Sequence, residues 1–122
     1  MNRPDEMLLS LLATFTVEAA EHLQVLSSGL LELEGEREAG RQREIVETVF
    51  REAHSLKGAA RAVDLADVAG LCQSLESVLA ALKRQEVALS PGLLDLLHQG
   101  VMSLAELLAR PGTQRPAAQR AA

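Results

Sequence analysis

The sequence predicts an all-α protein, an antiparallel up-down four-helix bundle. Apolar residues recur at intervals of three and four along four stretches of the chain, which is the signal of amphipathic helices. Two phenylalanines, with no tyrosine or tryptophan, leave a core of Leu, Val and Ala that suits packed helices better than a sheet. The connections are short and polar, so consecutive helices are expected to run antiparallel. At 122 residues, the chain has the length of one domain.

The first helix is expected to follow Pro4 and to run through "EMLLSLLATFTVEAAEHLQVLSSGLLELE", residues 6–34. Its predicted buried stripe consists of Leu8, Leu12, Phe15, Ala19, Leu23, Leu26, Leu30 and Leu33. The run Ser27-Ser28-Gly29 is a weak point, at which a bend or a break is expected. The polar segment "EGEREAGRQRE", residues 34–44, holds two glycines and is expected to contain the first connection.

The second helix is predicted from about Gln42 to Val63, with a buried stripe of Ile45, Val49, Ala53, Leu56, Ala60 and Val63. Asp64 is expected to be the N-cap of a third helix that runs from Leu65 to about Arg84. The fourth helix is expected from Pro91 to about Arg110, with Ser90 as its cap. Residues 111–122 have the composition of a linker or disordered tail, so the predicted domain covers residues 1–110.

Charge and cysteine content exclude several classes of function. The net charge of −5 argues against a nucleic-acid partner, whose phosphates would repel the chain. Cys72 is the single cysteine and falls in an apolar stripe, so it is predicted to be a small core residue without a disulfide. The first fifteen residues are too polar and too short for a membrane span or a signal peptide. We therefore expect no membrane insertion and a cytoplasmic location.

His54 is the candidate for chemistry. At roughly 100° per residue, it lies far from the apolar stripe of its helix and is expected to face solvent. Basic residues and a glycine share this exposed face, with a phenylalanine at its edge: Arg51, Lys57, Gly58, Arg61 and Phe50. A solvated histidine without a function is the simplest interpretation of such a face. Gly58 favours the functional one, since glycine inside a helix costs about 1 kcal/mol relative to alanine.

The residues around His54 suit phosphoryl chemistry. Imidazole is a nucleophile at neutral pH, because a large fraction of it is unprotonated. A phosphoryl group on His54 would be stabilised by the charge of Lys57, with Arg51 and Arg61 as further support. Gly58 would let another protein approach the ring closely.

Other kinds of site are not expected. His22 and His98 have no Cys or His at ligand spacing, so we predict surface histidines and no metal site. No Ser-His-Asp pattern, phosphate-binding loop or Walker motif is present. The chain is therefore expected to need no cofactor and to hold no ATP-binding site of its own.

The segment "FREAHSLKGAARAVDLADVAGLCQSLESVLAALKRQE" resembles the histidine-containing phosphotransfer (HPt) domain. More narrowly, it is similar to the N-terminal phosphotransfer domain of chemotaxis-type sensor histidine kinases, over about residues 8–110. The resemblance implies that His54 is the phosphoacceptor, Lys57 its electrostatic support, and Gly58 the small residue that opens the site. It also implies that Glu76 hydrogen-bonds the other imidazole nitrogen and that Gln73 lies near the site.

The resemblance implies a phosphorelay module that belongs to a histidine kinase and acts as a monomer. His54 would accept a phosphoryl group from a kinase ATP-binding domain, in cis or in trans, and pass it to an aspartate of a response-regulator receiver domain. The linker-like C-terminus favours a fragment of a larger kinase. The sequence departs from the family pattern at two positions. Relatives often have glycine at the position of Asp64 and a small or neutral residue at the position of Arg61. The alternative is a non-catalytic helical interaction module that docks a kinase or a receiver.

Overall fold

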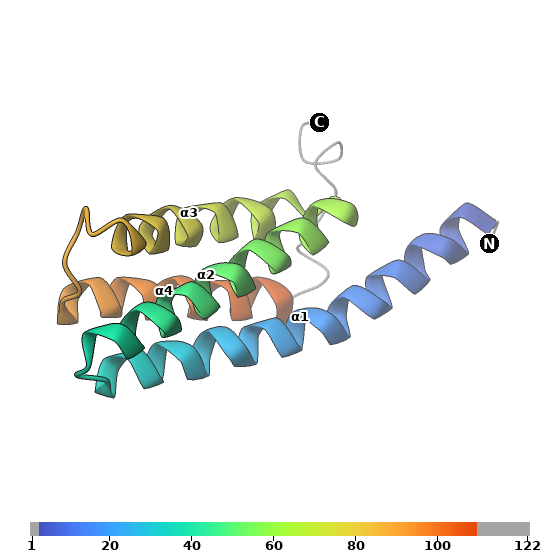
Figure 1. Cartoon of the computed structure of the whole chain (residues 1–122). Helices are drawn as coiled ribbons and strands as arrows, with labels where there is room; N and C mark the ends of the chain where they lie inside the picture. The colour runs from blue at the N-terminus through green and yellow to red at the C-terminus, as the bar shows by residue number, and fades with distance from the viewer. Residues whose placement is uncertain (1–2, 110–122) are drawn as a thin grey trace.

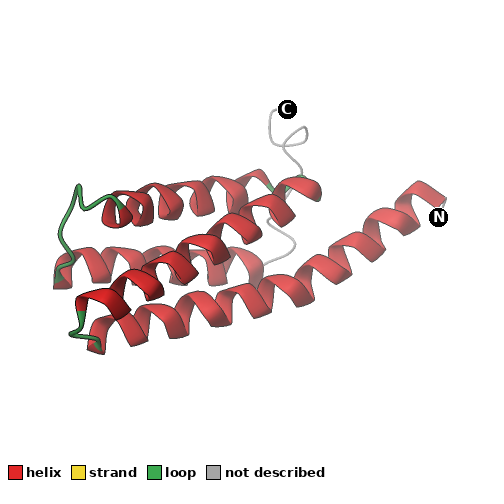
Figure 2. Ribbon diagram, in the orientation of Figure 1, coloured by secondary structure: helices red, strands yellow, loops and turns green. Residues whose placement is uncertain are grey.

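The computed structural model describes residues 3–109 and shows, over that range, helices and no strand (Figures 1 and 2). The helices are α1 (Arg3–Gly35), α2 (Ala39–Ala62), α3 (Ala66–Lys83) and α4 (Pro91–Ala109). Consecutive helices run in opposite directions, and α1 and α3 each pack against both α2 and α4 (Figure 1). The antiparallel four-helix bundle is thus confirmed. The predicted tail 111–122 and the predicted helix end at Arg110 lie outside the described residues.

The core consists of aliphatic side chains from all four helices. The predicted stripe of α2 is buried along its whole length. The stripe of α1 is buried from Phe15 onward except at the half-buried Leu23, but the first predicted member, Leu8, is 44% exposed. Leu8 is exposed because α1, at 33 residues the longest helix, projects beyond the other three (Figure 1). The helical period therefore predicted which face is apolar, but not where the bundle ends.

The predicted break in α1 is wrong, since the helix is continuous through Ser27, Ser28 and Gly29. The Ser28 hydroxyl donates to the carbonyl oxygen of Gln24 at 2.8 Å, which ties the serine to its own helix. A Cβ atom at Gly29 would lie only 2.6 Å from Cγ2 of Val49 on α2. The glycine therefore allows α1 and α2 to approach closely.

The first connection is shorter than expected, because α2 begins at Ala39 and leaves only residues 36–38 outside the helices. The turn between α2 and α3 also differs from the prediction. Asp64 does not cap α3; its φ of 59° is left-handed, and the N-cap position belongs to Leu65. The backbone N–H groups of Asp64 and Leu65 donate to the carbonyl oxygens of Arg61 and Ala60, which is the Schellman arrangement that ends a helix.

The start of α4 confirms the prediction. Ser90 Oγ accepts a hydrogen bond from the backbone N–H of Leu93 at 3.1 Å, and Pro91 is the first helical residue. Among the described residues, no helix combines the length and the apolar character that crossing a bilayer requires.

Candidate functional site

His54 lies on the solvent side of the seam between α2 and α3. Its side chain is 65% exposed, and its Nδ1 atom is 3.0 Å from Oε1 of Glu76 on α3. An ionised carboxylate can only accept a hydrogen bond, so Nδ1 carries the proton. In the neutral ring, Nε2 then holds the free lone pair. The arrangement presents one nucleophilic nitrogen of a largely exposed imidazole.

Glu76 lies buried in the seam and connects His54 with Lys57. Its Oε2 atom is 2.6 Å from Nζ of Lys57, and the carboxylate side chain is only 8% exposed. Burial by itself raises the pKa of the Glu76 carboxyl, but the hydrogen bonds from Lys57 and His54 outweigh burial and lower the pKa below its ordinary value. Glu76 is therefore ionised at neutral pH, as an acceptor for Nδ1 of His54 must be.

Lys57 does not lie on the exposed strip where the helical angle placed it. Its side chain is 10% exposed, and Nζ donates to Oε1 of Gln73 at 3.1 Å in addition to its contact with Glu76. The prediction was wrong because Lys57 lies at the edge of the apolar stripe, where α3 covers it. Its ammonium group is thus directed at the carboxylate beside His54.

The antiparallel register of α2 and α3 explains these contacts. Three contacts between these helices join residues whose numbers add up to the same sum: 54 and 76, 57 and 73, and 47 and 83. Two antiparallel helices that pair side by side require this relation. Gln73 itself is exposed, and its Nε2 atom is 3.5 Å from the hydroxyl of Ser77, one turn further on. Sequence reasoning missed Ser77, although its spacing of four from Gln73 was a signal.

Gly58 lies one turn beyond His54 on the same exposed face. A Cβ atom at Gly58 would have no heavy atom within 4 Å apart from its own neighbours, and the same holds for Gly70 on α3. Packing inside the described part of the chain therefore does not require glycine at position 58. The surface next to His54 is open to an approaching group.

The other predicted site residues lie along the same seam. Arg61 is exposed and forms no ion pair with any residue that the structure describes, whereas Nε of the exposed Arg51 is 3.8 Å from Glu47. Phe50 is half-buried, and Nζ of Lys83 lies 4.4 Å from its ring centroid. Sequence reasoning missed Lys83, which covers Phe50 and also pairs with Glu47 at 2.7 Å.

The prediction that His22 and His98 are plain surface residues was wrong. His22 is half-buried and contacts Glu52 on α2 through Nδ1, and Nε2 of the half-buried His98 is 3.6 Å from Glu34 on α1. Over residues 3–109, no group of His, Cys, Asp and Glu could hold a metal ion. Cys72 is buried as predicted, and burial, aided by the charge of Glu76, raises the pKa of its thiol to about 12.

Comparison with known proteins agrees with this geometry. The family model "Hpt domain" matches residues 10–110. The chemotaxis protein CheA of Cereibacter sphaeroides is 36% identical over 104 residues, which are 84% of this chain and 15% of that protein. CheA of Listeria monocytogenes is 34% identical over 91 residues, or 75% of this chain and 14% of that protein. The chain thus spans about one seventh of the length of these relatives.

A solved structure supports the same relationship. The CheA phosphotransferase domain from Thermotoga maritima superposes with a TM-score of 0.75 at 31% identity. The match covers 84% of this chain and 94% of that domain, so it includes all four helices rather than a local motif. The chain therefore belongs to the Hpt domain family and is homologous to the phosphotransfer domain of CheA.

Proposed function

We propose that His54 carries a phosphoryl group between an ATP-bound histidine kinase domain and a receiver domain. The lone pair of Nε2 attacks the γ-phosphorus of ATP, a P–N bond forms, and the bond from that phosphorus to the ADP oxygen breaks. A carboxylate oxygen of a receiver aspartate then attacks the same phosphorus, and the P–N bond breaks. The ring returns to its starting state with the proton still on Nδ1.

The hydrogen bond between His54 and Glu76 is the observation that carries this proposal. It keeps the proton on Nδ1 and the lone pair on Nε2, and it stabilises the positive charge that the ring acquires when Nε2 is phosphorylated. Lys57 acts through Glu76 by keeping that carboxylate ionised, and its charge also favours the approach of a phosphoryl group. Gln73 holds Lys57 in place.

The open surface beside His54 is the proposed approach path for both partners. Gly58 leaves free space next to the ring. Arg61, which pairs with no acidic residue that the structure describes, carries a positive charge two turns beyond His54 on the same face. Such a charge would attract the acidic active site of a receiver and the phosphates of ATP. Arg51 and Phe50 extend this surface in the other direction, where Glu47 and Lys83 already engage them.

The ATP-binding site is proposed to come from a separate kinase domain. The chain spans about one seventh of its CheA relatives and has no Walker-type motif, so we assign it the part of phosphocarrier. The kinase domain acts in cis or in trans, and the proposed location is the cytoplasm, where ATP is available. The reaction needs no cofactor bound to the bundle itself.

Phosphorylation assays test the proposal. The chain is incubated with γ-labelled ATP and catalytic cores of several CheA relatives that lack their own phosphotransfer domains. We expect an acid-labile, base-stable phosphate that is lost in His54→Gln and retained in the control His22→Gln. Undiminished labelling of His54→Gln would contradict the proposal, and so would the absence of label from the parent with every core. Receiver binding without any labelling would instead support the interaction-module alternative.

A further inference from the structure

The ammonium group of Lys57 is already engaged inside the seam between α2 and α3. Its Nζ atom lies 2.6 Å from Oε2 of Glu76 and donates to Oε1 of Gln73 at 3.1 Å. The carboxylate of Glu76 therefore balances the charge of Lys57. A phosphoryl group on Nε2 of His54 brings about two further negative charges at neutral pH. The cation that balances them must come from the exposed face of the seam.

Arg61 is the candidate for that cation. It is exposed and pairs with no acidic residue in the described part of the chain, whereas Nε of Arg51 is 3.8 Å from Oε1 of Glu47. Seven residues make about two helical turns, so Arg61 and His54 lie within about 20° of each other around the axis of α2. The guanidinium group carries a planar fork of donors that matches the oxygens of a phosphoryl group. Arg61 thus has both the position and the chemistry for this contact.

Gly58 lies between His54 and Arg61 on the same face of α2. The Cα atoms of His54 and Arg61 are about 10 Å apart along the helix axis. Side chains of an α-helix lean towards its N-terminus, so the long side chain of Arg61 leans across Gly58 towards His54. A Cβ atom at Gly58 would meet no heavy atom within 4 Å apart from its own neighbours. The glycine therefore leaves open the one turn that the arginine has to cross.

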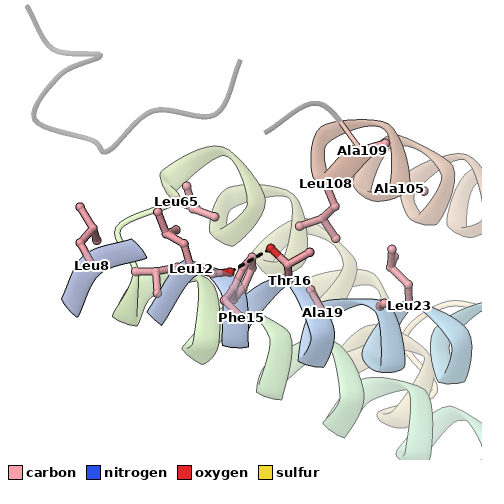
Figure 3. Close-up of a pocket in the computed structure, with 12 residues that line it drawn as sticks. Leu8, Leu12, Phe15, Thr16, Ala19, Leu23, Leu65, Ala105, Leu108 and Ala109 are labelled. Atoms are coloured by element: carbon pink, nitrogen blue, oxygen red, sulfur yellow. Dashed lines mark hydrogen bonds between the residues drawn. The ribbon is translucent and has the colours of Figure 1, made fainter. Parts of the chain in front are cut away.

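The surroundings of Arg61 do not fix its side chain. It borders a hollow of about 340 Å³ between the end of α2 and the start of α3, together with Asp64 and Gln73. Among the described residues, no ion pair joins Arg61 to Asp64, although both border this hollow. A second hollow at the same turn, beside α1 and α4, has aliphatic walls and no charged residue (Figure 3). Only the hollow on the seam side therefore places a cation near His54.

We propose that Arg61 binds the phosphoryl group of phosphorylated His54 by reaching across Gly58. Its guanidinium N–H groups donate to two phosphoryl oxygens, while Nδ1 of the ring keeps its hydrogen bond to Glu76. Lys57 supports Glu76, and Arg61 makes the phosphoryl contact that the family resemblance assigns to Lys57. This contact rests on the proposed phosphotransfer function and deepens it, because Arg61 stabilises the phosphorylated state of the chain.

The equilibrium constant of phosphoryl transfer from ATP to the chain, measured with a CheA catalytic core, tests this contact. A catalyst does not change an equilibrium, so a role of Arg61 in docking alone would alter only the rate. We expect Arg61→Ala to lower the constant about fivefold and Arg61→Lys about twofold, because lysine keeps the charge but not the fork. Arg43→Ala is the control, since Arg43 is exposed on α2 about 16 Å from His54, beyond the Debye length.

A second measurement needs no kinase. Nε2 of His54 attacks the phosphorus of phosphoramidate, a new P–N bond forms, the bond to the amino nitrogen breaks and ammonia leaves. The ³¹P NMR signal of this product is identified by its absence from His54→Gln. Titration of that signal should give a higher phosphoryl pKa in Arg61→Ala than in the parent, because a nearby cation stabilises the dianion. The side chain added in Gly58→Leu fills the gap, so Arg61→Ala should change neither quantity in that background.

Three results would overturn the contact while leaving the proposed function intact. The first is an unchanged equilibrium constant and phosphoryl pKa in Arg61→Ala. The second is an equal change in Arg43→Ala, which would indicate an effect of net charge. The third is an equal effect of Arg61→Ala with and without Gly58→Leu, which would contradict the path across Gly58. A parent whose His54 gains no phosphate from any core would instead overturn the proposed function, and this contact with it. Circular dichroism verifies folding, which the exposure of position 61 and the open space at position 58 lead us to expect.

Discussion

Replacing Glu76 with glutamine separates the charge of the carboxylate from its shape. Glu76 and Lys57 form an ion pair of 2.6 Å whose side chains are 8% and 10% exposed. Removing one partner of a buried ion pair costs about 3–5 kcal/mol. The amide oxygen can still accept one hydrogen bond, so we expect Glu76→Gln to lower the free energy of unfolding by about 2–3 kcal/mol. In a domain of this size, such a loss lowers Tm by about 10–20 °C.

The pH dependence identifies the source of the loss. The pKa of Glu76 in the folded chain lies below its ordinary value of 4.5, so its ionised form stabilises the fold. This contribution is complete above pH 4.5 and disappears as the pH falls through the folded pKa. The difference in unfolding free energy between parent and Glu76→Gln should therefore be largest at neutral pH and should shrink in acid.

Urea unfolding, followed by circular dichroism at pH 7 and at several values below 4.5, measures this difference. Glu86→Gln is the control, because Glu86 is exposed in the connection after α3, and its loss of stability should stay within about 0.5 kcal/mol. A difference for Glu76→Gln that is the same at neutral and acidic pH would refute the argument from the buried ion pair.

The same variant tests the chemistry. A glutamine amide can donate to Nδ1 of His54, which favours the tautomer with its proton on Nε2 and removes the nucleophilic lone pair. We expect the rate of phosphoryl transfer to His54 to fall about 10–100-fold, as for other groups that orient a functional histidine. Transfer at the parental rate, measured where the variant is folded, would show that Glu76 does not set the tautomer.

Further predictions concern single positions. Gly58→Ala should raise the free energy of unfolding by about 1 kcal/mol because the added Cβ meets no atom. Gly29→Ala should lower it by about 1–2 kcal/mol because the added Cβ meets Val49 at 2.6 Å. Thermal unfolding of both variants measures these changes, and equal shifts of Tm would contradict the prediction. Asp64→Gly should raise stability by about 0.5–1 kcal/mol, since φ is 59°, and a decrease in urea titrations would show that the aspartate side chain matters more than its backbone. Cys72 should resist thiol reagents at pH 8 until the chain unfolds, because its pKa is about 12; rapid reaction of the folded chain would disprove its burial.

The exposed N-terminal part of α1 and the exposed histidine of α2 illustrate what the helical periodicity can predict. A stripe of apolar residues shows which side of a helix faces apolar groups, and for α2 this predicted both the core and the exposure of His54. The same stripe continues towards the start of α1, where Leu8 is 44% exposed because α1 projects beyond the other helices of the described bundle. The length of a neighbour cannot be read from the helix it covers, so the end of the bundle could not be predicted.

Asp64 and Gly29 show where local rules failed. Asp64 has the residue type of an N-cap, but the chain reverses sharply there and places it in a left-handed conformation at the end of α2. Gly29 has the residue type of a helix breaker, but its small size serves the contact with Val49. In both cases tertiary geometry outweighed a preference of less than about 2 kcal/mol.

The amino-acid sequence by itself determined the four helices, their antiparallel order, the solvent-facing position of His54 and the family resemblance, because these depend on residue spacing within one segment. Only the tertiary structure decided that Lys57 is buried against Glu76, that Gln73 holds it, and that α1 projects beyond its neighbours. Those features depend on the register and relative lengths of helices that are distant along the chain. Residue spacing within a helix sets neither quantity, because both arise when the separate apolar faces pack together.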